Sequence, residues 1–371
     1  MRARRVRVRR HRHRHCRAVG AQSAKASKNN HTMPKTTSEP MHGLGPGGHP
    51  PWAAGAPALR AEDTLAQAAS AALGTKLRQL LASTEALRQD AQDPETLHQL
   101  HVALTRFRST VRLFDLQRHD PRWRAACQQA RVLAKVVGKA RDLEVFCTGA
   151  LQAICQVHPG DRALRAFAAR ARSSQTQARD ECRKALCAPE ATRFALETLG
   201  LSERVVQASD VRAGTDAYLG SDPALHAPVA PFLQRRLQKL WARLHRRLRH
   251  AHSARSWHRA RLAAKALRHA LELALPMLPH RRRRARALKN LVHLQQRLGQ
   301  AHDQTMVRKL AQRLAIVPND PTKAHALTLV EAWCAAHRQS RPPSQVHLQK
   351  IQAQLGKLAK KPKATDGKWT K

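Results

Sequence analysis

The 371-residue sequence has few aromatic residues and few acids. Six Trp, six Phe and one Tyr make up its whole aromatic content. Proteins that bind single-stranded nucleic acid stack bases on aromatic side chains, at about 1–3 kcal/mol per base, so this shortage disfavours that class. Asp and Glu number 25 against 68 Lys and Arg, which gives a formal net charge of +43. Such a charge attracts polyanions, so nucleic acid, an anionic membrane surface and a phosphate polymer are the candidate partners.

Several sequence signals are also missing. No apolar run approaches the roughly 18 residues that a membrane span needs. The P-loop, GxSxG, HExxH and GxGxxG patterns do not occur, so we expect neither an enzyme nor a cofactor. The seven cysteines are scattered without a CxxC pair, which predicts reduced, buried thiols and a reducing, cytoplasmic setting.

The patterning from Leu59 onward is helical, with Asp-Pro and Pro-Gly-Asp steps at the expected helix starts. No segment alternates as a strand would. We therefore predict an all-α fold of two repeated antiparallel helical bundles. The predicted parts are a disordered basic segment at 1–58, bundles at 59–208 and 224–340, a linker at 209–223, and a basic tail at 341–371. The later helices are expected at 141–157, from Pro159-Gly160-Asp161 to about 187, and at 189–207, 229–252, 255–275, 281–299, 301–316 and 320–338.

The first segment has more than one interpretation. Met1–His31 contains nine Arg, two Lys and no acid, and it lacks the apolar region of a secretory signal. An organellar transit peptide would have this composition. Translation that begins at Met33 or Met41 would explain it equally well.

An internal repeat is the most informative feature. The stretch from His98 to Arg108 corresponds to the stretch from His258 to Arg268, at an offset of 160 positions. Gly138-Lys-Ala-Arg141-Asp142 likewise corresponds to Gly299-Gln-Ala-His302-Asp303. Because basic residues repeat together with the apolar pattern, both copies are expected to bind an anion.

A helical wheel divides each repeated helix into two faces. In the first copy Leu100, Leu104, Phe107, Val111 and Phe114 fall on the apolar side, opposite a basic row. In the second copy the apolar side is formed by Ala260, Ala264, Leu267 and Leu271, again opposite a basic row. A row of cations along about 15 Å of helix matches a chain of phosphates. The basic rows comprise His98, His101, Thr105, Arg108 and Arg112, then His258, Arg261, Lys265 and Arg268.

These stretches, together with 133–145 and 288–307, resemble the conserved histidine α-helical domain (CHAD) family of polyphosphate-binding proteins. The resemblance covers about residues 60–340. It implies an all-helical fold with a basic central groove for inorganic polyphosphate, no catalysis, and a place at cytoplasmic polyphosphate granules. The ExExK motif of relatives that process triphosphate is missing. The residues expected to bind polyphosphate are His98, His101, Arg106, Arg108, Arg112, Lys135, Lys139, Arg141, His258, Arg261, Lys265, Arg268, Lys289, Arg297 and His302.

Some positions depart from the family pattern and some have other interpretations. The family usually has basic or Arg residues at the positions of His101, Thr105, Ala266 and His302. Such losses would either weaken affinity or leave the second half as the stronger site. Asp142 and Asp303 are more simply helix caps or ion-pair partners than acid-base catalysts. A metal site is disfavoured, because the many histidines lie among cations with few carboxylates nearby. Nucleic-acid binding through the phosphate backbone is the alternative function.

Overall fold

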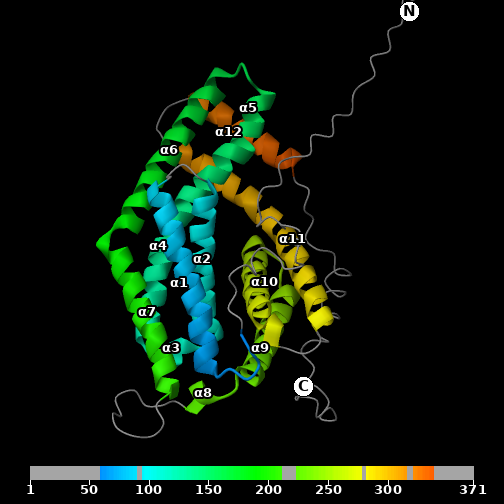
Figure 1. Cartoon of the computed structure of the whole chain (residues 1–371). Coiled ribbons are helices and arrows are strands. Elements are labelled where there is room, and N and C mark those ends of the chain that lie inside the picture. Colours follow the sequence, from blue (N-terminus) through cyan, green and yellow to red (C-terminus); the bar gives the residue numbers. More distant parts are fainter. Residues whose placement is uncertain (1–58, 90–93, 211–222, 278–280, 316–320, 338–371) are drawn as a thin grey trace, which may run out of the picture. The chain divides into compact units, whose positions relative to one another are not determined.

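The computed structural model describes residues 59–89, 94–210, 223–277, 281–315 and 321–337. Every named element in these ranges is a helix, and the one β-type contact is an isolated bridge between Thr64 and Pro228 (Figure 1). The all-α prediction is therefore confirmed for the part of the chain that the structure describes. The segment 1–58, most of the linker 209–223 and the 341–371 tail lie outside the described residues.

The helices follow the sequence signals closely at several of their starts. The Asp161 side chain accepts a hydrogen bond of 2.8 Å from the Leu164 backbone N–H, which caps the helix that follows it. Ser253 and Ser256 form a reciprocal capping box. The first set of helices is α1 (Leu65–Gln89), α2 (Pro94–Leu113), α3 (Leu116–His119), α4 (Arg122–Val145), the π-helix η2 (Phe146–Leu151), α5 (Gln152–Val157), α6 (Arg162–Cys187) and α7 (Pro189–Asp210). The second set is α8 (Pro223–His226), α9 (Val229–Arg249), α10 (Ala254–Ala274), the 3₁₀ turn η3 (Leu275–Met277), α11 (Arg281–Leu314) and α12 (Pro321–Ala336).

Two predicted helix boundaries are wrong. The expected break between 299 and 301 does not occur, because α11 continues through Gly299 to Leu314. A helical glycine costs only about 1 kcal/mol, and buried Leu291, Leu294 and Leu298 hold this helix in a core. No new helix starts near 141 either, since α4 passes into the π-helical turn η2 and then into α5.

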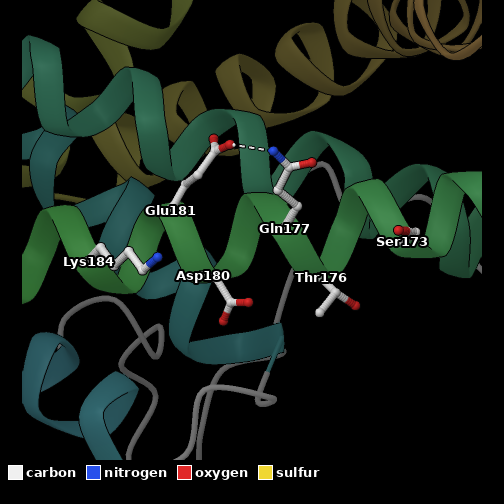
Figure 2. A pocket seen from close by; sticks show the side chains of 6 residues that line it. All are labelled: Ser173, Thr176, Gln177, Asp180, Glu181 and Lys184. Carbon is white, nitrogen blue, oxygen red and sulfur yellow. Dashed lines mark hydrogen bonds between the residues drawn. The ribbon is translucent and has the colours of Figure 1, made fainter.

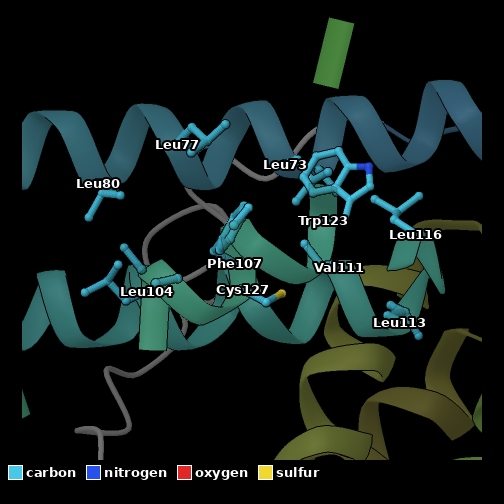
Figure 3. Close-up of a cluster of buried hydrophobic side chains, with 14 of the residues drawn as sticks. Leu73, Leu77, Leu80, Leu104, Phe107, Val111, Leu113, Leu116, Trp123 and Cys127 are labelled. Atoms are coloured by element: carbon cyan, nitrogen blue, oxygen red, sulfur yellow. The ribbon is translucent and has the colours of Figure 1, made fainter. Parts of the chain in front are cut away.

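The largest core lies between α1, α2, α4 and α7 (Figure 3). The apolar faces predicted for the two repeated helices are confirmed, because the nine residues that the helical wheel assigned to those faces are at most 4% exposed. Phe107 of α2 meets Phe194 of α7 edge to face, with ring centroids 5.7 Å apart. The close-up labels Leu73, Leu77, Leu80, Leu104, Phe107, Val111, Leu113, Leu116, Trp123 and Cys127.

The cores cross the predicted linker. Val229 and Leu233 of α9 and Ala270 of α10 belong to the largest core, with α1 and α2. A second core joins α9, α10 and α11. A third joins η2 and α6 to α11 and α12, where Phe146 packs against Phe167. Helices from both repeats therefore share buried surface.

The described cysteines and helices bear on two expectations from composition. The six described cysteines are free, and four of them (Cys127, Cys147, Cys182 and Cys334) are buried. No helix among the described residues is both long and apolar enough to cross a membrane.

Candidate functional site

The site begins with the two repeated helices, α2 and α10, which pack against each other. Their apolar faces lie in the cores, so their polar rows remain at the edge of the packed helices. His98, His101 and Arg108 of α2 are half-buried, whereas Arg112 is exposed. His258, Arg261 and Lys265 of α10 are also half-buried.

A glycine faces the second residue of each row. A Cβ on Gly138 of α4 would lie 3.8 Å from the His101 imidazole. A Cβ on Gly299 of α11 would lie 3.8 Å from Arg261 Nε. The two repeats therefore have the same local geometry, with a basic side chain lying against a helix that lacks a side chain at that point.

Residues from both repeats meet around Asp303 of α11. Burial raises the pKa of Asp303, while the nearby guanidinium groups of Arg261 and Arg141 oppose this rise and the Asp142 carboxylate adds to it. The pKa of His258 is lowered by burial, and then by repulsion from Arg261 and Lys309. Arg141 of the first repeat and Arg261 of the second thus act on the same carboxyl group.

A second cationic cluster surrounds Glu272, the one acid between Asp222 and Asp303. Arg268 Nε lies 2.6 Å from Glu272 Oε1, and an Arg268 terminal nitrogen donates a hydrogen bond of 3.3 Å to Gln295 Oε1. A terminal nitrogen of Arg106 lies 3.6 Å from Glu272 Oε2. Arg268 is only 6% exposed. The structure thus places two predicted binding residues, Arg106 and Arg268, in a buried ion-pair cluster.

Lys76 of α1 belongs to the same cluster and was missed from the sequence. Its side chain is buried, and its Nζ donates a hydrogen bond of 3.2 Å to Gln79 Oε1. Burial, followed by repulsion from Arg106, lowers the pKa of Lys76 to about 8, although Glu272 opposes this. The signal was present in the sequence: Lys76 stands at helical spacing between Leu73 and Leu80, on the apolar face of α1.

Three predicted binding residues also have a buried donor atom without a partner. The Nε atoms of Arg106, Arg108 and Arg261 are buried and make no hydrogen bond to any described residue. Burial, and then repulsion from Arg112, lowers the pKa of Arg108. A buried donor without an acceptor costs about 1–3 kcal/mol, so an anion that supplied oxygens here would be favoured.

The remaining predicted residues are less concentrated. Lys139 forms an ion pair of 2.6 Å with Glu181 of α6. Lys135 and Lys289 are exposed, and Arg297 is half-buried. The side chain of His302 lies outside the described part of the structure. Within that part, no three His, Cys, Asp or Glu side chains are grouped as metal ligands would be.

A shallow hollow on α6 offers different chemistry (Figure 2). Its lining includes Asp180 and Glu181, and Gln177 donates a hydrogen bond of 3.2 Å to Glu181. Carboxylates repel a polyanion, so this hollow does not belong to the cationic site.

Comparisons with known proteins identify the family of the chain. No curated protein matches the chain. The chain is similar to the crystal structure of the CHAD domain from the plant Ricinus communis, with 28% identity and a TM-score of 0.65 over 81% of this chain and 94% of that one. PptA from Streptomyces chartreusis matches at 15% identity and a TM-score of 0.48, over 80% of this chain and 99% of that one. The CHAD domain family matches residues 71–312. The chain therefore belongs to the CHAD domain family.

Proposed function

We propose that this chain binds inorganic polyphosphate, without catalysis, along the cationic surface formed by α2, α4, α10 and α11. One observation carries the proposal: cations of both repeats converge where carboxylates are too few to neutralise them. Asp303 and Asp142 face three guanidinium groups, those of Arg141, Arg261 and Arg313, and three cations surround the single Glu272. A polymer with a negative charge on every phosphate would supply the missing countercharge.

The proposal assigns polyphosphate binding to both repeats and also names a cellular setting. Two equivalent basic helices, each with its row against a glycine, would give a long polymer two neighbouring attachment points. Long chains should then bind more tightly than short ones, because the second attachment is made by an already tethered ligand. The cytoplasm, at polyphosphate granules, is the setting that we propose.

Retention on immobilised polyphosphate at physiological salt tests the proposal. The test variant is Arg141→Gln with Arg261→Gln. Each lost charge-assisted hydrogen bond costs about 1.5–3 kcal/mol, so we expect affinity to fall by about a hundredfold or more. The matched control is Arg183→Gln with Arg193→Gln, which removes the same charge from exposed positions on α6 and α7.

A second pair keeps the test independent of folding. Arg112→Gln with Lys289→Gln changes only exposed side chains, and we expect a smaller loss of retention. If both double variants are retained on immobilised polyphosphate as well as the control variant is, the proposed surface is wrong. A preference of tenfold or more for duplex DNA or RNA over polyphosphate, in direct competition, would instead favour the nucleic-acid alternative.

A further inference from the structure

A separate positive surface lies on α9, which contributes no residue to the site above. The 21 residues of α9 include seven Arg or Lys and no acid. Five of these cations are exposed, and none has an ion pair with a described carboxylate. We call them the α9 stripe: Arg235, Lys239, Arg243, Arg246 and Arg249.

The five residues share one face of the helix. At about 100° per residue they fall within a sector of about 120°. Leu233, Leu244 and Leu248 are buried on the opposite face, toward the cores that α9 shares with its neighbours. The stripe therefore points away from the packed helices and into solvent. With a rise of about 1.5 Å per residue, it extends over about 21 Å.

The other cations of α9 have different surroundings. Arg236 donates a hydrogen bond of 3.0 Å from Nε to the Leu113 carbonyl and lies 3.8 Å from Asp115. Arg247 is half-buried. Arg236 thus holds α9 against the end of α2, whereas the stripe makes no comparable contact within the described structure.

We propose that the α9 stripe is a second polyanion-binding surface, and that its partner is the phosphate backbone of duplex nucleic acid. Successive cations of the stripe are three or four residues apart, which places them about 4.5–6 Å apart along a rigid helix. A duplex carries one charge per roughly 1.7 Å of its axis, so every cation of the stripe finds a phosphate within reach. Contacts to phosphates alone are independent of sequence.

Two other partners fit less well. A helix that binds a membrane surface inserts its apolar face among the lipids, but the apolar face of α9 is already buried in the protein cores. A single strand would stack its bases on aromatic rings, and Trp241, the one Trp of α9, is half-buried in those cores. The proposal does not depend on polyphosphate binding, because no stripe residue belongs to that site.

The test uses the full chain and a DNA duplex of about two helical turns, with fluorescence anisotropy measured at several salt concentrations. The variant is Arg235→Gln, Lys239→Gln and Arg243→Gln. Each lost phosphate contact lowers the slope of log affinity against log salt by about 0.9, so we expect a slope reduced by about 2.7 and affinity at least about tenfold lower. Because this slope change reports the three removed cations only, cationic segments that are common to all variants do not mask it.

The controls separate the outcomes. Arg165→Gln, Arg183→Gln and Arg193→Gln together remove equal charge from exposed positions on α6 and α7, and we expect little change. The α9 variant should retain polyphosphate affinity, and the Arg141→Gln, Arg261→Gln variant should retain duplex affinity. The inference is overturned if the α9 variant binds duplex DNA as tightly as the control variant does. It is also overturned if the α9 variant loses as much affinity for polyphosphate as for duplex DNA, or if it loses only its binding to vesicles that contain anionic lipid.

Discussion

Lys76 should make the fold less stable at neutral pH, and replacing it with Met should remove that cost. The pKa of Lys76 is lowered from 10.5 to about 8, mainly by burial. Each pKa unit corresponds to about 1.36 kcal/mol, so holding this lysine charged costs about 3 kcal/mol. We expect Lys76→Met to raise the free energy of unfolding by about that amount at pH 7, as measured by urea denaturation followed by circular dichroism.

The cost depends on pH in a defined direction. Below about pH 8 both the folded and the unfolded chain bind the Lys76 proton, and the full cost is present. Between about pH 8 and 10.5 the unfolded chain binds this proton more strongly than the folded one, so the contribution to unfolding free energy rises with pH. Above pH 10.5 the cost is gone. The advantage of Lys76→Met over the wild type should therefore shrink across this window.

Comparing the wild type with Lys76→Met isolates the contribution of this lysine to the pH dependence of the unfolding free energy. Burial raises the pKa of Cys147 to about 11 and that of Cys182 to about 12, and both thiols titrate equally in the two proteins. Lys184→Met, at an exposed position on α6, is the matched control and should change stability little. Parallel pH profiles for Lys76→Met and the wild type, with no gain at pH 7, would refute the reasoning.

Three further predictions concern the site and its support. Binding of polyphosphate should raise the lowered pKa of His258, so affinity should increase as pH falls from 8 to 6, and His258→Gln should flatten this pH profile in binding titrations. Gly299→Ala should stabilise α11 by up to about 1 kcal/mol and keep affinity, because its Cβ would lie in ordinary contact with Arg261; Gly299→Leu should reduce polyphosphate retention by displacing that side chain. Glu144→Gln should lower the free energy of unfolding by about 3–5 kcal/mol in urea, since it removes the carboxylate charge that faces the buried Arg179 guanidinium; an unchanged midpoint would contradict this.

Local periodicity predicted the apolar faces correctly. The nine residues assigned to the apolar sides of α2 and α10 are all buried, because a face of a helix is determined by spacing along the chain. Periodicity placed Arg268 among the binding residues and the family resemblance placed Arg106 there, but neither carried information on long-range partners. The Arg268–Glu272 pair is a local i, i+4 contact within α10, whereas only the packing of α2 against α10 brings Arg106 to the same carboxylate.

Continuity of helices was harder to predict. Gly299 suggested a break in α11, but the apolar residues on both sides of it are buried in cores that hold the helix straight through the glycine. The π-helical turn after Val145 has no signal in the sequence. Such a turn inserts one residue into the helical register, which depends on how η2 packs against α6, α11 and α12.

The bridge between Thr64 and Pro228 closes the chain over a long distance. Leu65 donates a backbone hydrogen bond of 2.9 Å to the Ala227 carbonyl, and Val229 donates one of 3.0 Å to the Asp63 carbonyl. Closing a loop of roughly 160 residues costs about 4–5 kcal/mol in entropy, whereas these two bonds contribute about 1 kcal/mol each. Burial of Leu65 and Val229 in the largest core supplies the remainder, so the ring can close only when the intervening helices have docked.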